Sequence, residues 1–481
     1  MISNLDNEKF IVNNDQKIEH GMKKIDINMN KIVFVVSENN KKLVGSLSDG
    51  DIRRYLLRKG DIKDTISKAC NKNPIFARES YLNSDLERIL KNKSNILIPV
   101  INNERRIVRI INQSNSNPYP IYKPFLCGNE MEYVIDCLDT NWISSQGKYV
   151  RKFESQFDNL LNDKFTSISV CNGTAALFLA LKAFGIGKDD KVAVPLITFA
   201  ATANAVLHTG AEPVFVDIDK DTWCLDPNQL RETIKLGIKA FISVDLFGNS
   251  CNSKALRKIA DESNIFFIED AAEALGTKYQ GEHIGNLSDA VTFSFFGNKT
   301  VTTGEGGMVS FKLNKFAEKA RILRDHGMDP NRKYWHTIIG YNLRITNIQS
   351  AIGVAQMERL DKIIEQKVTI NNYYKKYLSP EFIPQKEEFD TRSTWWLNSF
   401  LLPKSIIRDK FIEICKQHDL DVRPGFYMLN QMPCFENYST VSQSISSDIH
   451  KRIICFPSFI SISESDIKEI SKIANNALSI S

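Results

Sequence analysis

A lysine amine and a carboxylate stand out because the sequence places both in apolar surroundings. Lys299 lies in "SFFGNKTVTTGEGG", and Asp270 ends the apolar run "NIFFIED". An amine in such a setting tends to lose its charge, and a neutral amine forms a Schiff base with an aldehyde. A carboxylate at the end of a strand can keep a ring nitrogen protonated. The pair predicts chemistry on a flat ligand that carries an aldehyde and a ring nitrogen.

A third signal suits a phosphate. Asn172, Gly173 and Thr174 follow the run "SISVC" and open an apolar helix, whose first N–H groups and a hydroxyl would point outward at its positive end. Ser294 adds another hydroxyl just before Lys299. A phosphate, a ring nitrogen and an aldehyde together describe pyridoxal 5'-phosphate (PLP), which is the cofactor we expect.

Each signal also has a plainer interpretation. In this interpretation Asn172 or Thr174 serves only as a helix N-cap, Asp270 caps a following helix, and Lys299, like most lysines, is a solvated surface cation. The glycines at 304–307 match neither phosphate-loop pattern, so they predict a tight turn before the strand "MVSF". The three signals support one another because each would bind a different part of one cofactor.

The elements that must position these residues are short β-branched runs alternating with helical patterns, such as "TSISVC", "AEPVFVDID", "KAFISVDLFG" and "SDAVTFSFF". This alternation predicts an α/β fold with a mainly parallel sheet flanked by helices, and ligands then gather at the carboxyl ends of the strands. From about Asn371 the alternation is less regular. We expect a large PLP-binding domain over 116–370 and a smaller C-terminal α+β lobe over 371–481.

The first 115 residues contain a tandem repeat. "VSENNKKLVGSL" and "VINNERRIVRII" share one pattern at an offset of 64 residues. The segment "LVGSLSDGDIRRYLL" resembles the first half of a CBS-domain pair, and this resemblance implies that Ser48 and Asp51 hold a nucleotide ribose. Asn112 replaces the second copy's serine, so at most one nucleotide site is expected. A packing or oligomerisation module without a ligand is the alternative. The polar segment 112–124 predicts an interdomain connection.

Length and composition limit the class of protein. A chain of 481 residues is longer than one hydrophobic core usually supports, so more than one domain is expected. Its 42% hydrophobic and 25% charged residues are typical of a globular protein. The net charge of +5 has no basic run, so nothing favours nucleic acid. The nine cysteines contain no C-x-x-C pair, which favours neither a disulfide framework nor a zinc site. The sequence shows neither a signal peptide nor an apolar stretch long enough to span a membrane. We therefore expect a cytoplasmic protein that binds neither a metal nor a membrane.

From about Tyr119 to the C-terminus the chain resembles the DegT/StrS family of fold-type I, PLP-dependent sugar aminotransferases. The matching segments, in order, are "NWISSQGKYVRKFE", "VCNGTAALFLAL", "VPLITFAATANAV", "FIEDAAEALG", "SFFGNKTVTTGEGG" and "GYNLRITNIQSAIG". Relatives that dehydrate a sugar carry histidine at the position of Lys299. Lysine therefore predicts transamination.

The resemblance implies a role for each matched residue. Lys299 would link to the cofactor and later move protons between carbons. Asp270 would pair with the pyridine nitrogen, and Glu273 with the ring hydroxyl. The other expected cofactor contacts are Gly173, Thr174 and Ser294 at the phosphate, Phe199 on the ring, and Asn342 at the phosphate of the neighbouring subunit. This last role implies a homodimer with shared active sites, and the N-terminal domain is a candidate for further assembly.

Within the family the resemblance favours enzymes that use glutamate to aminate carbon 4 of GDP-4-keto-6-deoxymannose, giving GDP-perosamine for O-antigen. Trp335, His336 and Arg423 are then expected near the nucleotide sugar. Met428–Leu429–Asn430 stands where relatives carry Pro-Val-His, so a UDP-linked 2-acetamido-4-keto-6-deoxyhexose stays open as the substrate. A more remote alternative is a nucleotide-sensing regulator with a vestigial aminotransferase domain.

Overall fold

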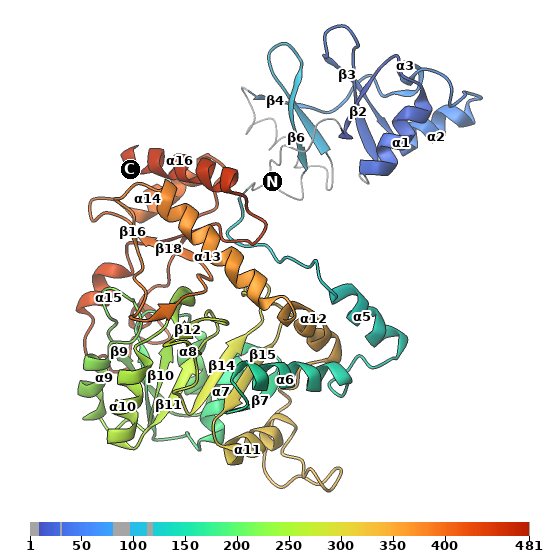
Figure 1. Cartoon of the computed structure of the whole chain (residues 1–481). Coiled ribbons are helices and arrows are strands. Elements are labelled where there is room, and N and C mark those ends of the chain that lie inside the picture. Colours follow the sequence, from blue (N-terminus) through green and yellow to red (C-terminus); the bar gives the residue numbers. More distant parts are fainter. Residues whose placement is uncertain (1–8, 29–30, 80–96, 113–118, 481) are drawn as a thin grey trace. The chain divides into compact units, whose positions relative to one another are not determined.

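The computed structural model describes residues 9–28, 31–79, 97–112 and 119–480, which fall in two compact units, Met1–Pro120 and Ile121–Ser481 (Figure 1). Most of the polar segment that we expected to connect two domains, residues 113–118, lies outside the described residues. Within the described ranges, no helix combines the length and the apolar character that crossing a membrane requires.

The first unit contains two three-stranded sheets of the same topology. Their strands are β1 (Ile11–Asn13), β2 (Ile32–Val36) and β3 (Leu43–Ser48), then β4 (Ala77–Arg78), β5 (Leu97–Ile101) and β6 (Ile107–Asn112). In each sheet the first strand is parallel to the second, and the second and third form an antiparallel hairpin. The register repeats, since Asn13 pairs with Val36 and Ala77 with Val100. Lys42 in one hairpin bridges Arg106 in the other.

Helices complete this unit on the side of the first sheet. They are α1 (Ile18–Asn28), α2 (Asp49–Leu57) and α3 (Ile66–Ala69). Ile18, Ile52 and Ile66 from the three helices are buried in one cluster with Val33 and Leu47 of the sheet. The first hairpin and its helices therefore share an apolar core.

The second unit is built on a seven-stranded sheet. In spatial order its strands are β7 (Thr166–Val170), β15 (Gly307–Phe311), β14 (Ala290–Ser294), β11 (Phe266–Asp270), β10 (Ala240–Val244), β8 (Lys191–Pro195) and β9 (Glu212–Val216). All neighbouring strands are parallel except β15, which is antiparallel to both of its neighbours. The predicted α/β fold with a mainly parallel sheet is confirmed. Gly304, with φ of +81°, lies in the tight turn that precedes β15.

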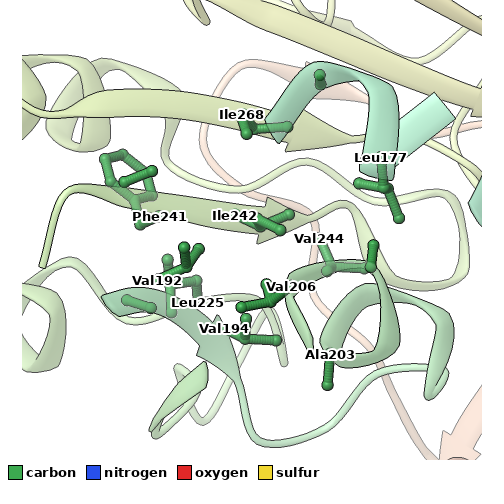
Figure 2. Packing of buried hydrophobic residues seen from close by; sticks show 14 of the residues in the cluster. Leu177, Val192, Val194, Ala203, Val206, Leu225, Phe241, Ile242, Val244 and Ile268 are labelled. Carbon is green, nitrogen blue, oxygen red and sulfur yellow. The ribbon is translucent and has the colours of Figure 1, made fainter. Parts of the chain in front are cut away.

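Helices cover this sheet, and apolar side chains fill the layer between them. The helices are α6 (Lys148–Leu160), α7 (Gly173–Ala183), α8 (Ala201–His208), α9 (Pro227–Ile234), α10 (Ser253–Ser263), α11 (Asn314–Arg324) and α12 (Asn347–Met357), and α5 (Glu130–Asp139) packs against α12. Figure 2 shows part of the core, where Val194 of β8 and Ile242 of β10 lie near Val206 of α8 and Leu177 of α7. Strands buried on both faces are expected to read as continuous apolar runs, as "AFISV" of β10 does.

The C-terminal part adds a four-stranded antiparallel sheet in the order β16 (Ile383–Pro384), β18 (Asn398–Leu401), β20 (Ile453–Phe456) and β19 (Arg423–Pro424). With it pack α13 (Leu360–Tyr377), α14 (Arg408–Gln417) and α16 (Glu464–Ile480). The remaining short elements are η4 (Leu246–Gly248), β12 (Lys278–Tyr279), β13 (Glu282–His283), β17 (Thr391–Arg392), η5 (Leu429–Gln431) and α15 (Ser444–Ile449). This is the expected α+β lobe. A domain boundary at residue 371 stays a prediction, and this residue lies inside α13.

Candidate active site

A cavity of about 420 Å³ lies where several parallel strands of the second unit end. Asn172 follows β7, Phe199 follows β8, Asp270 ends β11 and Ser294 ends β14. The expected cofactor residues that line it are Gly173, Thr174, Phe199, Asp270, Glu273, Ser294 and Lys299. Asn342 does not line the cavity of its own chain.

Asp270 is buried at the end of β11, with 5% of its surface exposed. Its Oδ2 accepts a hydrogen bond from Thr202 Oγ1 at 2.9 Å, and its Oδ1 accepts one from the Ala272 N–H at 3.2 Å. No helix follows it, so the alternative that Asp270 is a helix N-cap is wrong. Burial raises the pKa of Asp270, whereas these hydrogen bonds and the nearby Lys299 lower it. A carboxylate held in this way is suited to a cationic partner.

Lys299 lies in the turn between β14 and β15, and only 14% of its side chain is exposed. Its Nζ is 3.6 Å from Glu273 Oε1 and 4.0 Å from the centre of the Trp396 ring. Lys299 is therefore not a solvated surface cation. Burial raises the pKa of Glu273, and the charge of Lys299 opposes this effect.

Glu273 is held from its other side by the backbone. Its Oε2 accepts a hydrogen bond from the Phe247 N–H at 2.9 Å. Phe247 has φ of +58°, in the left-handed region that non-glycine residues rarely adopt. This strained backbone turns an N–H group toward the carboxylate beside Lys299.

The start of α7 forms a close-fitting wall of the cavity. Asn172 is the N-cap, because its Oδ1 accepts a hydrogen bond from the Ala175 N–H at 2.8 Å. A Cβ atom on Gly173 would lie 2.8 Å from Ser294 Cβ, and one on Gly307 would lie 2.4 Å from the Asn172 carbonyl oxygen. Glycine is thus required for this approach of backbone to backbone. The cap and the predicted phosphate contacts are compatible, since Gly173 and Thr174 line the cavity.

The expected sugar-binding residues lie outside this cavity. Trp335 and His336 are exposed, and the Trp335 ring is 4.0 Å from the Arg332 guanidinium. Arg423 begins β19, with its guanidinium 3.4 Å from Asp421. Asn342 is also exposed and accepts a hydrogen bond from Arg344 Nε at 3.1 Å. The roles of all four residues stay predictions.

Sequence reasoning missed several residues that the fold brings to the cavity, among them Thr202, Trp396 and Phe426. Thr202 lies three residues after Phe199 at the start of α8, so its position in the segment "TFAAT" was a usable signal. Trp396 comes from the C-terminal lobe, and its indole N–H donates to the Asn298 carbonyl at 2.6 Å across 98 residues of sequence. No local pattern reveals a contact of that kind.

The segment Met428–Leu429–Asn430, which raised doubt about the sugar, turns away from the cavity. Met428 and Leu429 are fully buried in the core of the second unit, and the Leu429 N–H donates to the Leu196 carbonyl at 3.0 Å. The Asn430 amide donates to Thr440 Oγ1 at 3.2 Å and to Gln443 Oε1 at 2.7 Å. The neighbouring residue that does line the cavity is Phe426.

In the first unit, Ser48 and Asp51 form a capping box at the start of α2. Ser48 Oγ donates to Asp51 Oδ2 at 2.6 Å, and the Asp51 N–H donates back to Ser48 Oγ at 3.3 Å. Asp51 also pairs with Arg54 at 2.6 Å. Both side chains have partners within their own unit, and a nucleotide contact there stays a prediction.

A second carboxyl pair is buried directly behind Asp270. Asp245 donates its main-chain N–H to the Asp270 carbonyl at 3.1 Å, and its carboxyl lies beside that of Glu269. Burial raises the pKa of Asp245 and raises the pKa of Glu269 to about 7. Burial therefore favours the protonated form of this pair.

We expect Asp245→Asn to flatten the pH dependence of stability. Both folded pKa values lie above their unfolded values, so the pair contributes its stability fully below about pH 4. That contribution is lost as pH rises through the folded pKa values, of which that of Glu269 is about 7, at up to about 1.4 kcal/mol per pH unit for each group. The asparagine amide donates to Glu269 without a titrating proton. Melting temperatures between pH 4 and 8 test this, and parallel curves for variant and wild type would contradict it.

The sequence matches two known protein families. Residues 126–474 match the model of the DegT/DnrJ/EryC1/StrS aminotransferase family, and residues 2–58 match the CBS domain. The chain is 41% identical over 349 residues to the GDP-perosamine synthase of Escherichia coli O157:H7, covering 72% of this chain and 95% of that protein. It is 38% identical over 363 residues to the GDP-perosamine synthase of Vibrio cholerae, covering 74% and 98%.

Solved structures agree with the fold. A DegT DnrJ EryC1 StrS aminotransferase from Brucella abortus superposes with a TM-score of 0.68 at 28% identity, covering 72% of this chain and 95% of that one. The Helicobacter pylori aminotransferase PseC has a TM-score of 0.72 at 24% identity, covering 76% of this chain and 100% of that one, which supports the fold alone.

Proposed function

The chain belongs to the DegT/DnrJ/EryC1/StrS aminotransferase family, and we propose on that basis that it transfers the amino group of glutamate to carbon 4 of GDP-4-keto-6-deoxymannose, giving GDP-perosamine. The observation that carries this proposal is its 38–41% identity to three proteins named GDP-perosamine synthase. The presence of Lys299 in the cavity supports transfer of an amino group.

The residues of the cavity fit PLP. Gly173, Thr174 and Ser294 would hold the phosphate at the start of α7, where a Cβ atom on Gly173 would collide with Ser294. Asp270 would hold the ring nitrogen, and Phe199 would cover the ring. When bound, PLP supplies an electron sink for carbanion chemistry.

The chain's own part is to hold and move protons. The amine of Lys299 has two neighbours in the cavity, the Glu273 carboxylate and the Trp396 ring, which keep it close to the reacting carbons. From there it takes a proton from one carbon and returns it to another, and so fixes the stereochemistry of the new C–N bond. Asp270 is buried and would stay charged against a protonated ring nitrogen.

Product analysis tests the substrate. With glutamate and a panel of GDP- and UDP-linked 4-keto-6-deoxy sugars, we expect mass spectrometry to find an aminated GDP-sugar, 2-oxoglutarate and ping-pong kinetics. Amination of a UDP-linked 2-acetamido sugar in its place would overturn the choice of nucleotide. Turnover of neither class would support the regulatory alternative.

We also propose that the enzyme is a cytoplasmic homodimer. The nine cysteines are all free, which is typical of a reducing compartment. Along one side of α5, Met131, Ile135 and Leu138 are 76%, 47% and 55% exposed, and Trp142 follows at 57%. An apolar row of this kind is typical of a subunit interface. Asn342 lies outside its own cavity, as a residue that serves a neighbour's site would.

Mixing two inactive variants tests the shared site. We expect Asn342→Asp to be nearly inactive, because its added charge repels the cofactor phosphate of the neighbouring subunit. Refolded together with Lys299→Ala, it should recover about one quarter of wild-type activity, since half of the dimers are mixed and each has one intact site. No recovery, with mixed dimers shown by mass spectrometry, would place Asn342 in the site of its own chain.

A further inference from the structure

Helix α13 buries a lysine amine that the proposed reaction does not use. Lys367 has none of its surface exposed. Its Nζ donates to the Trp396 carbonyl at 2.9 Å and to the Ser458 carbonyl at 2.5 Å. Burial lowers the pKa of Lys367 to about 7, and among the described residues no carboxylate opposes that shift. A buried amine of this kind is costly, so its contacts require an explanation.

The first contact leads to Lys299 through Trp396. Lys367 holds the Trp396 main chain, and the Trp396 indole N–H donates to the Asn298 carbonyl at 2.6 Å. The Trp396 ring itself lies 4.0 Å from Lys299 Nζ. Trp396 thus contacts both the amine of Lys299 and the peptide that precedes it.

A further contact of Lys367, with the ring of Tyr122, also leads to Lys299. Lys367 Nζ lies 4.7 Å from the centre of the Tyr122 ring. The Tyr122 hydroxyl donates to the main-chain carbonyl of Lys299 at 2.6 Å. Two residues that contact Lys367 therefore donate hydrogen bonds to two successive carbonyls, those of Asn298 and Lys299.

These contacts matter because the segment between β14 and β15 contains no helix or longer strand to fix Lys299. Its own backbone forms turns and isolated bridges. A displacement of about 1 Å at a reacting group can slow a reaction by about 100-fold. The precision of Lys299 must come from the side chains packed around its turn.

We propose that Lys367 is a positioning residue. It fixes the positions of Trp396 and Tyr122, and through them the position of the Lys299 amine. The inference rests on the proposed function, because that function assigns the chemistry to Lys299. Lys367 itself does not line the cavity.

Two variants of matched length separate hydrogen bonding from packing. Lys367→Met fills the space without a donor, whereas Lys367→Gln keeps N–H groups. In the full-length holoenzyme, we expect Lys367→Met to slow the glutamate half-reaction, followed by the absorbance of the bound cofactor, about tenfold with KM for glutamate within about twofold. Lys367→Gln should recover at least part of the rate. The control is Lys319→Met. Lys319 lies on α11, and its Nζ donates to the Ala183 carbonyl at 3.0 Å, so its loss should leave the rate unchanged.

A second measurement needs neither cofactor nor sugar. In the apoprotein, an acylating reagent should label Lys299 at a rate that Lys367→Met changes and Lys319→Met does not, as peptide mass mapping would show. A third is a double-mutant cycle: in a Trp396→Phe background, Lys367→Met should slow the half-reaction much less than in the wild type.

Three results would overturn the proposal: a folded Lys367→Met variant with unchanged rate and labelling, equal losses in the Met and Gln variants, or full additivity with Trp396→Phe. If Lys367→Met does not fold, the Gln variant and its labelling decide. Failure of the proposed function is a separate outcome, since the wild type itself would then show no glutamate half-reaction or aminate a different sugar.

Discussion

Lys299→Ala is expected to lower kcat at least about 10³-fold, because it removes the amine that binds the cofactor and the base that moves the proton. The visible absorbance of the bound cofactor should change as well. Loss of Lys299 leaves the buried Glu273 carboxylate without its cation, so we expect the pKa of Glu273 to rise further. We expect no other lysine to take over the role of Lys299.

Two lysine changes serve as comparisons. Lys312→Ala alters an exposed lysine just beyond β15 and should leave kcat and the spectrum unchanged. Lys299→Arg keeps a positive charge near Glu273 but supplies no nucleophilic amine, so it should be as inactive as Lys299→Ala. If Lys299→Ala kept both the wild-type spectrum and turnover, the assignment of Lys299 would be wrong.

Asp270→Asn is the second large effect that we expect, with kcat lower by about 10² to 10³-fold. The asparagine keeps the shape of the side chain and can still accept the hydrogen bond from Thr202, but it carries no charge to hold a protonated ring nitrogen. Stability should not fall much, because the change removes a carboxylate whose pKa burial raises. Steady-state kinetics and thermal unfolding together separate these effects.

Thr202→Val provides the graded comparison for Asp270. It removes one hydrogen bond to the carboxylate at 2.9 Å, so we expect about a tenfold loss of kcat, smaller than that of Asp270→Asn. Equal losses in the two variants would mean that the position of the carboxyl matters and its charge does not. Full activity of Asp270→Asn would mean that Asp270 does not act by holding the ring nitrogen.

Much of the fold and part of the site follow from local sequence patterns. Apolar runs such as those of β10 and β11 predict buried strands, and the rule that ligands gather at the carboxyl ends of strands directs attention to Asp270 and Ser294. The glycine-rich turn before β15 was also predictable. These features depend on residues that lie next to one another in the chain.

The rest depends on contacts between distant segments. Trp396 and Tyr122 reach Lys299 and its turn from the C-terminal lobe and from the start of the second unit, and Lys367 of α13 contacts both of them. The sequence around these three residues shows no sign of these contacts. The orientation of Met428 and Leu429 toward the core was equally hidden, because an apolar residue after a strand can face either a core or a ligand. Only the packed fold decides between the two.

The C-terminal origin of Trp396 and Phe426 has a consequence for biosynthesis. Because the walls of the cavity are contributed by residues from Asn172 to Phe426, a nascent chain has no complete pocket while its last lobe is still being translated. The cofactor can therefore bind a complete pocket only late in synthesis of the chain. Any product of premature termination before Trp396 carries the reactive lysine without the ring that covers it.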